Sequence, residues 1–206
     1  MIKLLNVVTY DSLIMKFTHL HEFSLVVNLN KEHARKNGLG GTKMKTAIIY
    51  ASSHGTTAKA ATLLSEKLTG DVTVIDLKKT KLPEINHYEA IILGGSIHAG
   101  MMQRKVTKFI KLNENVLMTK KIGLFLCCMH EGDQAKAQFE LAYPDKLRSH
   151  SISNSLFGGE FIFGKMNFLE KTIIKKMKGD TVDASTFNEE ALSEFVQKFQ
   201  QNSLTV

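Results

Sequence analysis

The sequence predicts a doubly wound α/β fold, in which helices cover both faces of a parallel sheet. Two observations predict this fold. Short apolar runs alternate with segments whose apolar residues recur at helical spacing. The runs are apolar on both faces, as expected for strands buried between two helix layers. The 206 residues are 43% apolar and 23% charged, which is typical of an ordinary soluble domain.

The expected elements follow one another in regular order. The first strand covers 46–51, and the helix after it carries Ala58, Ala61, Leu64 and Leu68. A second strand at 72–76, a connection at 78–86 with Pro83 and a third strand at 90–95 come next. Then come a helix marked by Val106, Phe109, Ile110 and Leu112, a strand at 121–129 and a helix at 134–141. A fifth strand within 152–163, interrupted by Gly158 and Gly159, precedes helices at 166–178 and 188–200.

Residues 1–43 lack this regularity, so we divide the chain into an N-terminal extension, 1–43, and a domain, 44–206. The codons of Gly40 and Gly41 can spell a ribosome-binding sequence just before Met44. We therefore expect that Met44 is the natural start and that 1–43 is a mis-assigned leader. A genuine N-terminal extension is the alternative.

Two features bear on the location of the protein. Its longest apolar runs, such as 122–129, are far shorter than the roughly 20 residues that span a bilayer. Its only cysteines, Cys127 and Cys128, form neither a CxxC pair nor a zinc ligand set. We expect a cytoplasmic protein, with peripheral contact at the inner face of the cell membrane as a further option.

The loop after the first strand is the most specific signal in the sequence. It combines a glycine, which lets the backbone approach a ligand, with four hydroxyl side chains at the start of a helix. This combination favours a phosphate, although neither a Walker A loop nor a GxGxxG fingerprint is present at this strand end. The alternative is a cluster that only caps the helix. The loop residues are Ser52, Ser53, His54, Gly55, Thr56 and Thr57.

This loop resembles the Ser/Thr-x-Thr-Gly-x-Thr phosphate loop of flavodoxins, with His54 in place of the usual threonine. The run Gly94–Gly100 is similar to the Gly-x-Ser-Ile-x-x-Gly loop of menaquinone-dependent protoporphyrinogen dehydrogenases, a flavodoxin-like family. Residues 164–183 are similar to that family's C-terminal basic and aromatic segment, whereas the loop at 127–133 differs from its counterpart. The resemblance implies a flavodoxin-like fold with five parallel strands in the order 2-1-3-4-5.

The same resemblance implies FMN as the cofactor and a set of residues that bind it. The loop at 52–57 would hold the phosphate of FMN, and two further loops would line its ring. The first of these comprises Ser96, Ile97, His98, Ala99 and Gly100, and the second comprises Cys128, Met129, His130, Glu131 and Gly132. No metal is expected, and no side chain is assigned as a catalytic acid or base.

Neither ring-side loop contains Trp, Tyr or Phe, so His98 and His130 are the nearest substitutes for the aromatic residues that commonly enclose a flavin. A protonated imidazole would stabilise the anionic reduced ring. The alternative for each histidine is exposure to solvent. For the two cysteines we expect simple burial, because no neighbouring positive charge is evident that would activate a thiol.

The segment 165–178 combines apolar residues with a basic face formed by Lys171, Lys175, Lys176 and Lys178. Such a helix can lie on an anionic membrane, although a core helix with a solvated lysine face is the alternative. The net charge of +7 suits a propionate-bearing porphyrinogen, a membrane that carries quinone, or an acidic redox partner protein. The expected function is oxidation of protoporphyrinogen IX with menaquinone as acceptor. The alternative is an electron carrier without its own substrate, and no nucleic-acid partner is expected.

Overall fold

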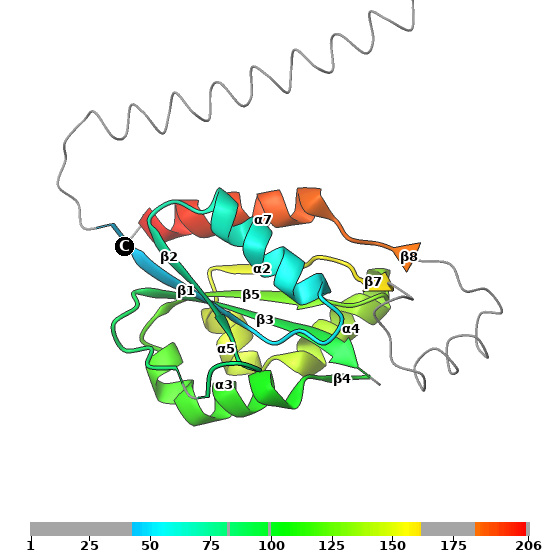
Figure 1. Ribbon diagram of the computed structural model, residues 1–206, viewed down its shortest axis with the longest axis horizontal. Coiled ribbons are helices and arrows are strands. Elements are labelled where there is room, and N and C mark those ends of the chain that lie inside the picture. The colour runs from blue at the N-terminus through cyan, green and yellow to red at the C-terminus, as the bar shows by residue number, and fades with distance from the viewer. Residues whose placement is uncertain (1–42, 82, 99, 162–183, 205–206) are drawn as a thin grey trace, which may run out of the picture. The chain divides into compact units, whose positions relative to one another are not determined.

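The computed structural model describes residues 43–81, 83–98, 100–161 and 184–204. Five parallel strands form the main path of the sheet, in the order β2-β1-β3-β5-β6 (Figure 1). Their bounds are β1 (Lys45–Tyr50), β2 (Asp71–Asp76), β3 (Ala90–His98), β5 (Lys121–Cys127) and β6 (Ser153–Leu156). The predicted fold and strand order, 2-1-3-4-5, are confirmed.

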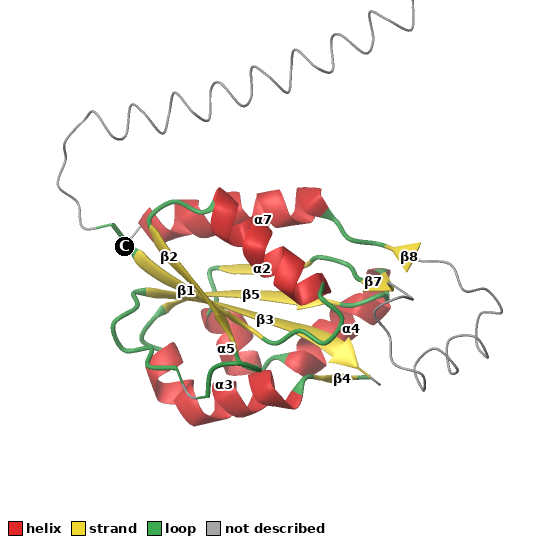
Figure 2. Ribbon diagram, in the orientation of Figure 1, coloured by secondary structure: helices red, strands yellow, loops and turns green. Residues whose placement is uncertain are grey.

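Helices cover both faces of this sheet (Figure 2). Helices α2 (Thr56–Lys67) and α7 (Glu189–Leu204) lie on one face. The opposite face carries α3 (Arg104–Leu117), α4 (Gly132–Ala142) and the short α5 (Asp145–His150), which the sequence pattern did not predict. Each face has its own hydrophobic core, one built around Ile48 and Leu64 and the other around Ile49 and Phe109. Neighbouring β1 residues thus point into different cores, as the period of a strand requires.

A glycine in β3 shapes the core under α2 and α7. Gly94 pairs with Phe125 of β5, and a Cβ at position 94 would lie 2.0 Å from the phenyl ring. The ring therefore lies over the backbone of β3, in the space that a side chain would fill. It stacks on Phe157 at a centroid distance of 4.9 Å, and Phe157 in turn meets Phe195 edge-on at 5.6 Å. The packing of the Phe125 ring thus explains why position 94 carries no side chain.

Three boundaries differ from the sequence prediction. Strand β3 continues to His98, because Ile97 and His98 pair with the two-residue strand β4 (Met101–Met102) in an antiparallel hairpin. The fourth predicted strand ends at Cys127, which makes the last strand pair of β5, with Ser96 of β3. The fifth divides at Gly158, whose φ of 69° turns the chain from β6 into β7 (Glu160–Phe161), which pairs with β8 (Ala184–Ser185).

Several predictions lie outside the described residues. These are the extension at 1–42, Ala99, and the helix at 166–178 with its four lysines. Within the part that the structure describes, no helix is both long enough and apolar enough to cross a bilayer.

Candidate functional site

The loop between β1 and α2 turns sharply at Gly55. Its φ of 105° and ψ of −21° place it in the left-handed region, which strains residues that carry a Cβ. The Gly55 N–H donates to the Ser52 hydroxyl at 3.0 Å, and the Gly55 carbonyl accepts from the Lys59 N–H at 2.8 Å. These bonds fix the loop across the start of α2.

The start of α2 suits an anion. Gly55 occupies the N-cap position, no side chain of the described residues caps the helix, and the first turn contains no acidic residue. The first N–H groups of a helix lack intrahelical partners and lie at the positive end of its dipole. No hydroxyl of the loop caps α2 in the described part of the chain, so the N–H groups of its first turn remain available to a phosphate.

One buried hydroxyl in this loop favours a ligand. The side-chain oxygen of Thr57 is buried and has no hydrogen-bond partner among the described residues apart from the weakly polar thiol of Cys127. A buried hydroxyl without a partner costs about 1–3 kcal/mol. An anionic oxygen bound at the start of α2 would give Thr57 its missing acceptor, so the loop fits the phosphate of FMN.

Two residues that sequence reasoning missed complete this loop. Lys78, the second residue after β2, donates from Nζ to the Ser53 hydroxyl at 3.0 Å. The amide of Gln103, just before α3, donates to the Ala51 carbonyl and accepts from the Ser53 hydroxyl at 2.9 Å and the Ser53 N–H at 3.2 Å. Lys78 brings a positive charge to the loop, and Gln103 ties it to the β3–β4 hairpin. Both residues follow the carboxyl ends of strands, where ligands bind in folds of this class, and this position was the signal in the sequence that could have identified them.

The first predicted ring-side loop is in part a strand. Ser96, Ile97 and His98 belong to β3 and are half-buried, and Gly100 lies in the turn to β4. The ring of His98 lies 5.1 Å from that of His54, between centroids, with the planes tilted by 39°. The histidine of the phosphate loop and the histidine of the ring-side strand therefore meet, which brings two of the three predicted segments together.

The second predicted ring-side loop is more open. The N–H of Cys128 donates to the Gly158 carbonyl at 3.0 Å, and its thiol points to the His130 carbonyl at 3.7 Å. His130 and Glu131 are exposed, while Met129 is half-buried and Gly132 begins α4. The His130 ring lies 2.9 Å, from Nδ1, from the Gln134 side-chain oxygen. The structure thus places His130 at the surface, as in the alternative considered for it.

Both cysteines are buried, as predicted. Burial raises the pKa of Cys127 to about 12, an effect that the nearby Thr57 hydroxyl partly offsets. Burial also raises the pKa of Cys128, against a smaller opposite effect of its hydrogen bond to the His130 backbone. Both side chains are therefore neutral thiols near pH 7, and Cys127 forms part of the floor below Thr57.

Comparison with known families decides the fold family. The model of the flavodoxin domain matches residues 47–187, which is more than half of the chain. The chain belongs to the flavodoxin domain family. The prediction of a flavodoxin-like domain is thereby confirmed, and FMN is confirmed as the cofactor expected for such a domain. The finer resemblance to protoporphyrinogen dehydrogenases stays a prediction.

Solved structures of flavodoxins resemble this one. Flavodoxin 1 from Bacillus cereus is 19% identical, with 79% of this chain and 99% of that chain covered and a TM-score of 0.47. An archaeal flavodoxin is 20% identical, with 76% and 99% covered and a TM-score of 0.45. The Fusobacterium nucleatum flavodoxin solved with flavin mononucleotide is 21% identical, with 40% and 51% covered and a TM-score of 0.33. The search of curated proteins found no match.

Proposed function

We propose that this flavodoxin-domain protein binds FMN at the carboxyl edge of its sheet and works as an FMN-dependent oxidoreductase. The observation that carries this proposal is the start of α2. There, a helix end without a side-chain cap among the described residues meets the buried hydroxyl of Thr57, whose one partner in that part of the chain is the weakly polar thiol of Cys127. When bound, FMN supplies a ring that accepts and donates electrons. The residues of this chain would bind and orient it.

The phosphate would be held by the loop at 52–57. The hydroxyls of Ser52 and Thr57 would donate to its oxygens, together with the first N–H groups of α2. Lys78, through its contact with Ser53, places a positive charge beside the same loop. These groups would bind FMN more tightly than flavins that lack the phosphate.

The ring would lie along β3 and the loop after β5. His98, held against His54, would form one side, and the backbone from Cys128 to Gly132 would form the other. Gln103 connects the loop at 52–57 to the β3–β4 hairpin, because its amide contacts both Ala51 and Ser53. Phosphate binding and ring binding would therefore depend on one connected set of residues.

For the substrate we propose protoporphyrinogen IX, oxidised to protoporphyrin IX, with menaquinone as the electron acceptor. Support comes from the Gly94–Gly100 sequence, from the similarity of residues 164–183 to the dehydrogenase family, and from the net charge of +7, which suits a substrate with propionate groups. In this proposal the four lysines of residues 171–178 would contact an anionic membrane that holds the quinone.

The second candidate is an electron-transfer protein without a substrate of its own. It is favoured by a surface beside the site, where Met101 and Leu141 are 64% and 84% exposed and lie close to basic residues of α3. Exposed apolar side chains of this size next to charges are typical of surfaces that contact another protein.

Anaerobic turnover distinguishes the two candidates. Flavin-loaded full-length protein is mixed with protoporphyrinogen IX and a menaquinone analogue, and the porphyrin formed is followed by fluorescence. We expect porphyrin formation that depends on the quinone and on FMN, well above the rate with the flavin-free protein. Reduction of the flavin by a redox protein, with no porphyrin formed, would instead support the electron carrier.

A further inference from the structure

A groove opens on the α3 and α4 side of the molecule, next to the β3–β4 hairpin. It has a volume of about 610 Å³ and is lined by residues of the hairpin, of α3 and of α4. Met101 lies at one side and Leu141 at another, and both are mostly exposed. In the hairpin, Met101 pairs directly with His98 of the candidate flavin site. The groove and the site therefore share one structural element.

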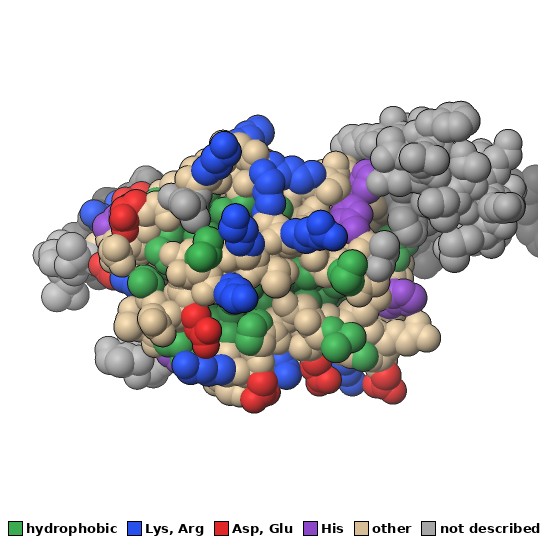
Figure 3. Space-filling view, turned by 90° about the horizontal axis from the view of Figure 1, so that it is seen from below, with side chains coloured by type: hydrophobic (Ala, Val, Ile, Leu, Met, Phe, Trp, Pro, Cys, Tyr) green, Lys and Arg blue, Asp and Glu red, His purple; other side chains and the backbone are tan. Residues whose placement is uncertain are grey.

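Three cations line the groove along one helix. Arg104, Lys108 and Lys111 are spaced by four and three residues, so they share one face of α3. All three are exposed, and none of their side chains forms an ion pair or hydrogen bond with another described residue. Figure 3 shows Lys and Arg side chains across this side of the molecule, with hydrophobic side chains between them. The charge of the groove is therefore not neutralised by the described part of the chain.

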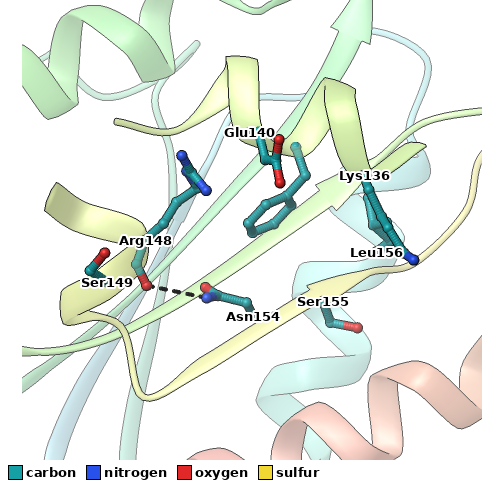
Figure 4. A pocket seen from close by; sticks show the side chains of 8 residues that line it. Lys136, Glu140, Arg148, Ser149, Asn154, Ser155 and Leu156 are labelled. Carbon is teal, nitrogen blue, oxygen red and sulfur yellow. Dashed lines mark hydrogen bonds between the residues drawn. The ribbon is translucent and has the colours of Figure 1, made fainter. Parts of the chain in front are cut away.

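A second groove on the same side differs from the α3 groove in the pairing of its cations. It has a volume of about 540 Å³ and lies between α4, α5 and β6, with Glu140 among its lining residues (Figure 4). Its cations already have partners, since Arg148 contacts Asp145 at 3.1 Å and Lys136 contacts Asp133 at 3.5 Å. The α3 groove differs because its three cations have no such partners among the described residues and because apolar side chains project beside them.

A polar group inside the α3 groove also lacks a partner. The side-chain oxygen of Gln138 is buried and accepts no hydrogen bond from the described residues. A buried acceptor of this kind is normally satisfied in native proteins, and the Gln138 side chain would have to turn toward the groove to meet a donor from an occupant. Backbone N–H groups of a polypeptide supply such donors.

We propose that the α3 groove is the docking site of an acidic partner protein that presents carboxylates around an apolar side chain. The carboxylates would meet Arg104, Lys108 and Lys111, and the apolar side chain would pack between Met101 and Leu141. A bilayer surface fits the groove less well, because a flat layer of head groups does not fill a depression between two helices. Docking here would bring the partner beside β3, which carries His98 of the candidate flavin site. Electron transfer between the partner and a flavin at that site rests on the proposed function.

The test measures binding to two redox proteins of opposite charge. Fluorescently labelled plant-type ferredoxin, which is strongly acidic, is titrated with the full-length protein, and cytochrome c serves as the basic probe. We expect binding of ferredoxin at low salt that weakens at least about tenfold at high salt, where screening acts over only a few Å. Binding of cytochrome c should be much weaker. The experiment needs no flavin, so a failure of FMN binding would leave it informative.

Charge-reversal variants locate the binding. The triple variant R104E, K108E and K111E should weaken ferredoxin binding at least about tenfold. At these three positions along the groove, attraction to the carboxylates of ferredoxin becomes repulsion. The matched control, K45E, K67E and K198E, changes the net charge equally with exposed lysines of β1, α2 and α7. The control should bind within about threefold of the unchanged protein. L141S should weaken binding at both salt concentrations, since this side chain is 84% exposed and its loss does not disturb the core.

Three results would overturn the proposal. The first is no binding of ferredoxin by the unchanged protein at low salt. The second is an equal loss in the α3 variant and the control, which would show an effect of net charge alone. The third is binding of phosphatidylglycerol vesicles, lost in the α3 variant, without binding of ferredoxin, which would make the groove a membrane contact. Thermal melts confirm that the variants fold, and the neutral triple R104Q, K108Q and K111Q replaces the reversal if it does not.

Discussion

The two ends of the candidate flavin site are built differently. At the phosphate end, Gly55, Ser52 and Ser53 are fixed by bonds within the loop and by side chains from two other elements. At the far end, the loop after β5 carries exposed His130 and Glu131. The first end is held by these hydrogen bonds before any ligand binds, whereas the second is open, because its side chains are exposed. We infer that the affinity for flavin comes mainly from the phosphate end, and that the open end is where a substrate or partner approaches.

The largest effect is expected when the phosphate is removed from the ligand. Riboflavin should bind at least about a thousandfold more weakly than FMN, because each hydrogen bond to a charged group contributes about 1.5–3 kcal/mol and several are lost. Flavin fluorescence quenching measures both affinities. Equal affinities would show that the loop at 52–57 does not hold the phosphate.

The second test concerns Cys127, the buried residue that contacts Thr57 at the phosphate end. The pKa of Cys127 is raised from 9.0 to about 12 in the folded protein, so between these values the folded state keeps a proton that the unfolded state loses. Stability is therefore lost as the pH rises through this range, by up to about 1.4 kcal/mol per pH unit from this group. Denaturant unfolding at pH 9 and pH 11 measures the loss, and Cys127→Ala should lessen it. An unchanged slope in that variant would contradict the burial of the thiol.

The third test uses two buried threonines. Thr57→Val should weaken FMN binding by about 1–3 kcal/mol, because a phosphate oxygen loses its donor. The same change should leave the flavin-free protein equally or more stable, because the hydroxyl that it removes has no partner among the described residues beyond the weakly polar Cys127 thiol. Thr46→Val is the matched control. Thr46 is also buried and its hydroxyl has no hydrogen-bond partner in the part of the chain that the structure describes, but it lies at the start of β1, away from the site.

The outcome of the threonine pair is read from two measurements, flavin titration and thermal unfolding. Both variants should retain stability, and only the change at position 57 should alter affinity for FMN. An equal loss of affinity in Thr46→Val would mean that the effect travels through the fold and that Thr57 has no direct contact with the phosphate.

The smallest expected effect is at the open end. His130→Ala should change the affinity for FMN by less than about threefold, since an exposed side chain contributes only a few tenths of a kcal/mol. His98→Ala, which removes the contact with His54, should have the larger effect. Titration of both variants sharpens the comparison, and a larger loss for His130→Ala would show that the His130 side chain itself contacts the ring.

The sequence pattern was enough to predict the sheet, because β1, β3 and β5 are buried on both faces and read as continuous apolar runs. It was also enough to find the loop at 52–57, since its hydroxyls and glycine are consecutive. The two-residue strand β4 was missed because Met101 and Met102 are too few to show a period. The helix α5 was missed for the same reason, as it spans only six residues.

Contacts between distant residues were beyond the sequence. Lys78 reaches Ser53 only because β2 lies beside β1, and Gln103 reaches it only because the β3–β4 hairpin folds back. The meeting of His54 with His98 likewise depends on how the strand ends are aligned. Such contacts follow from strand order and register, which a local pattern of residues does not contain.

The close fit of Gly94 under the ring of Phe125 has a consequence for how this sequence can change over time. Position 94 accepts a methyl group only after position 125 has become smaller, whereas position 125 can shrink first at the cost of a cavity. The order of substitutions is therefore constrained. Among descendants of this sequence, alanine at position 94 should occur together with an aliphatic residue at position 125, as an inherited pair.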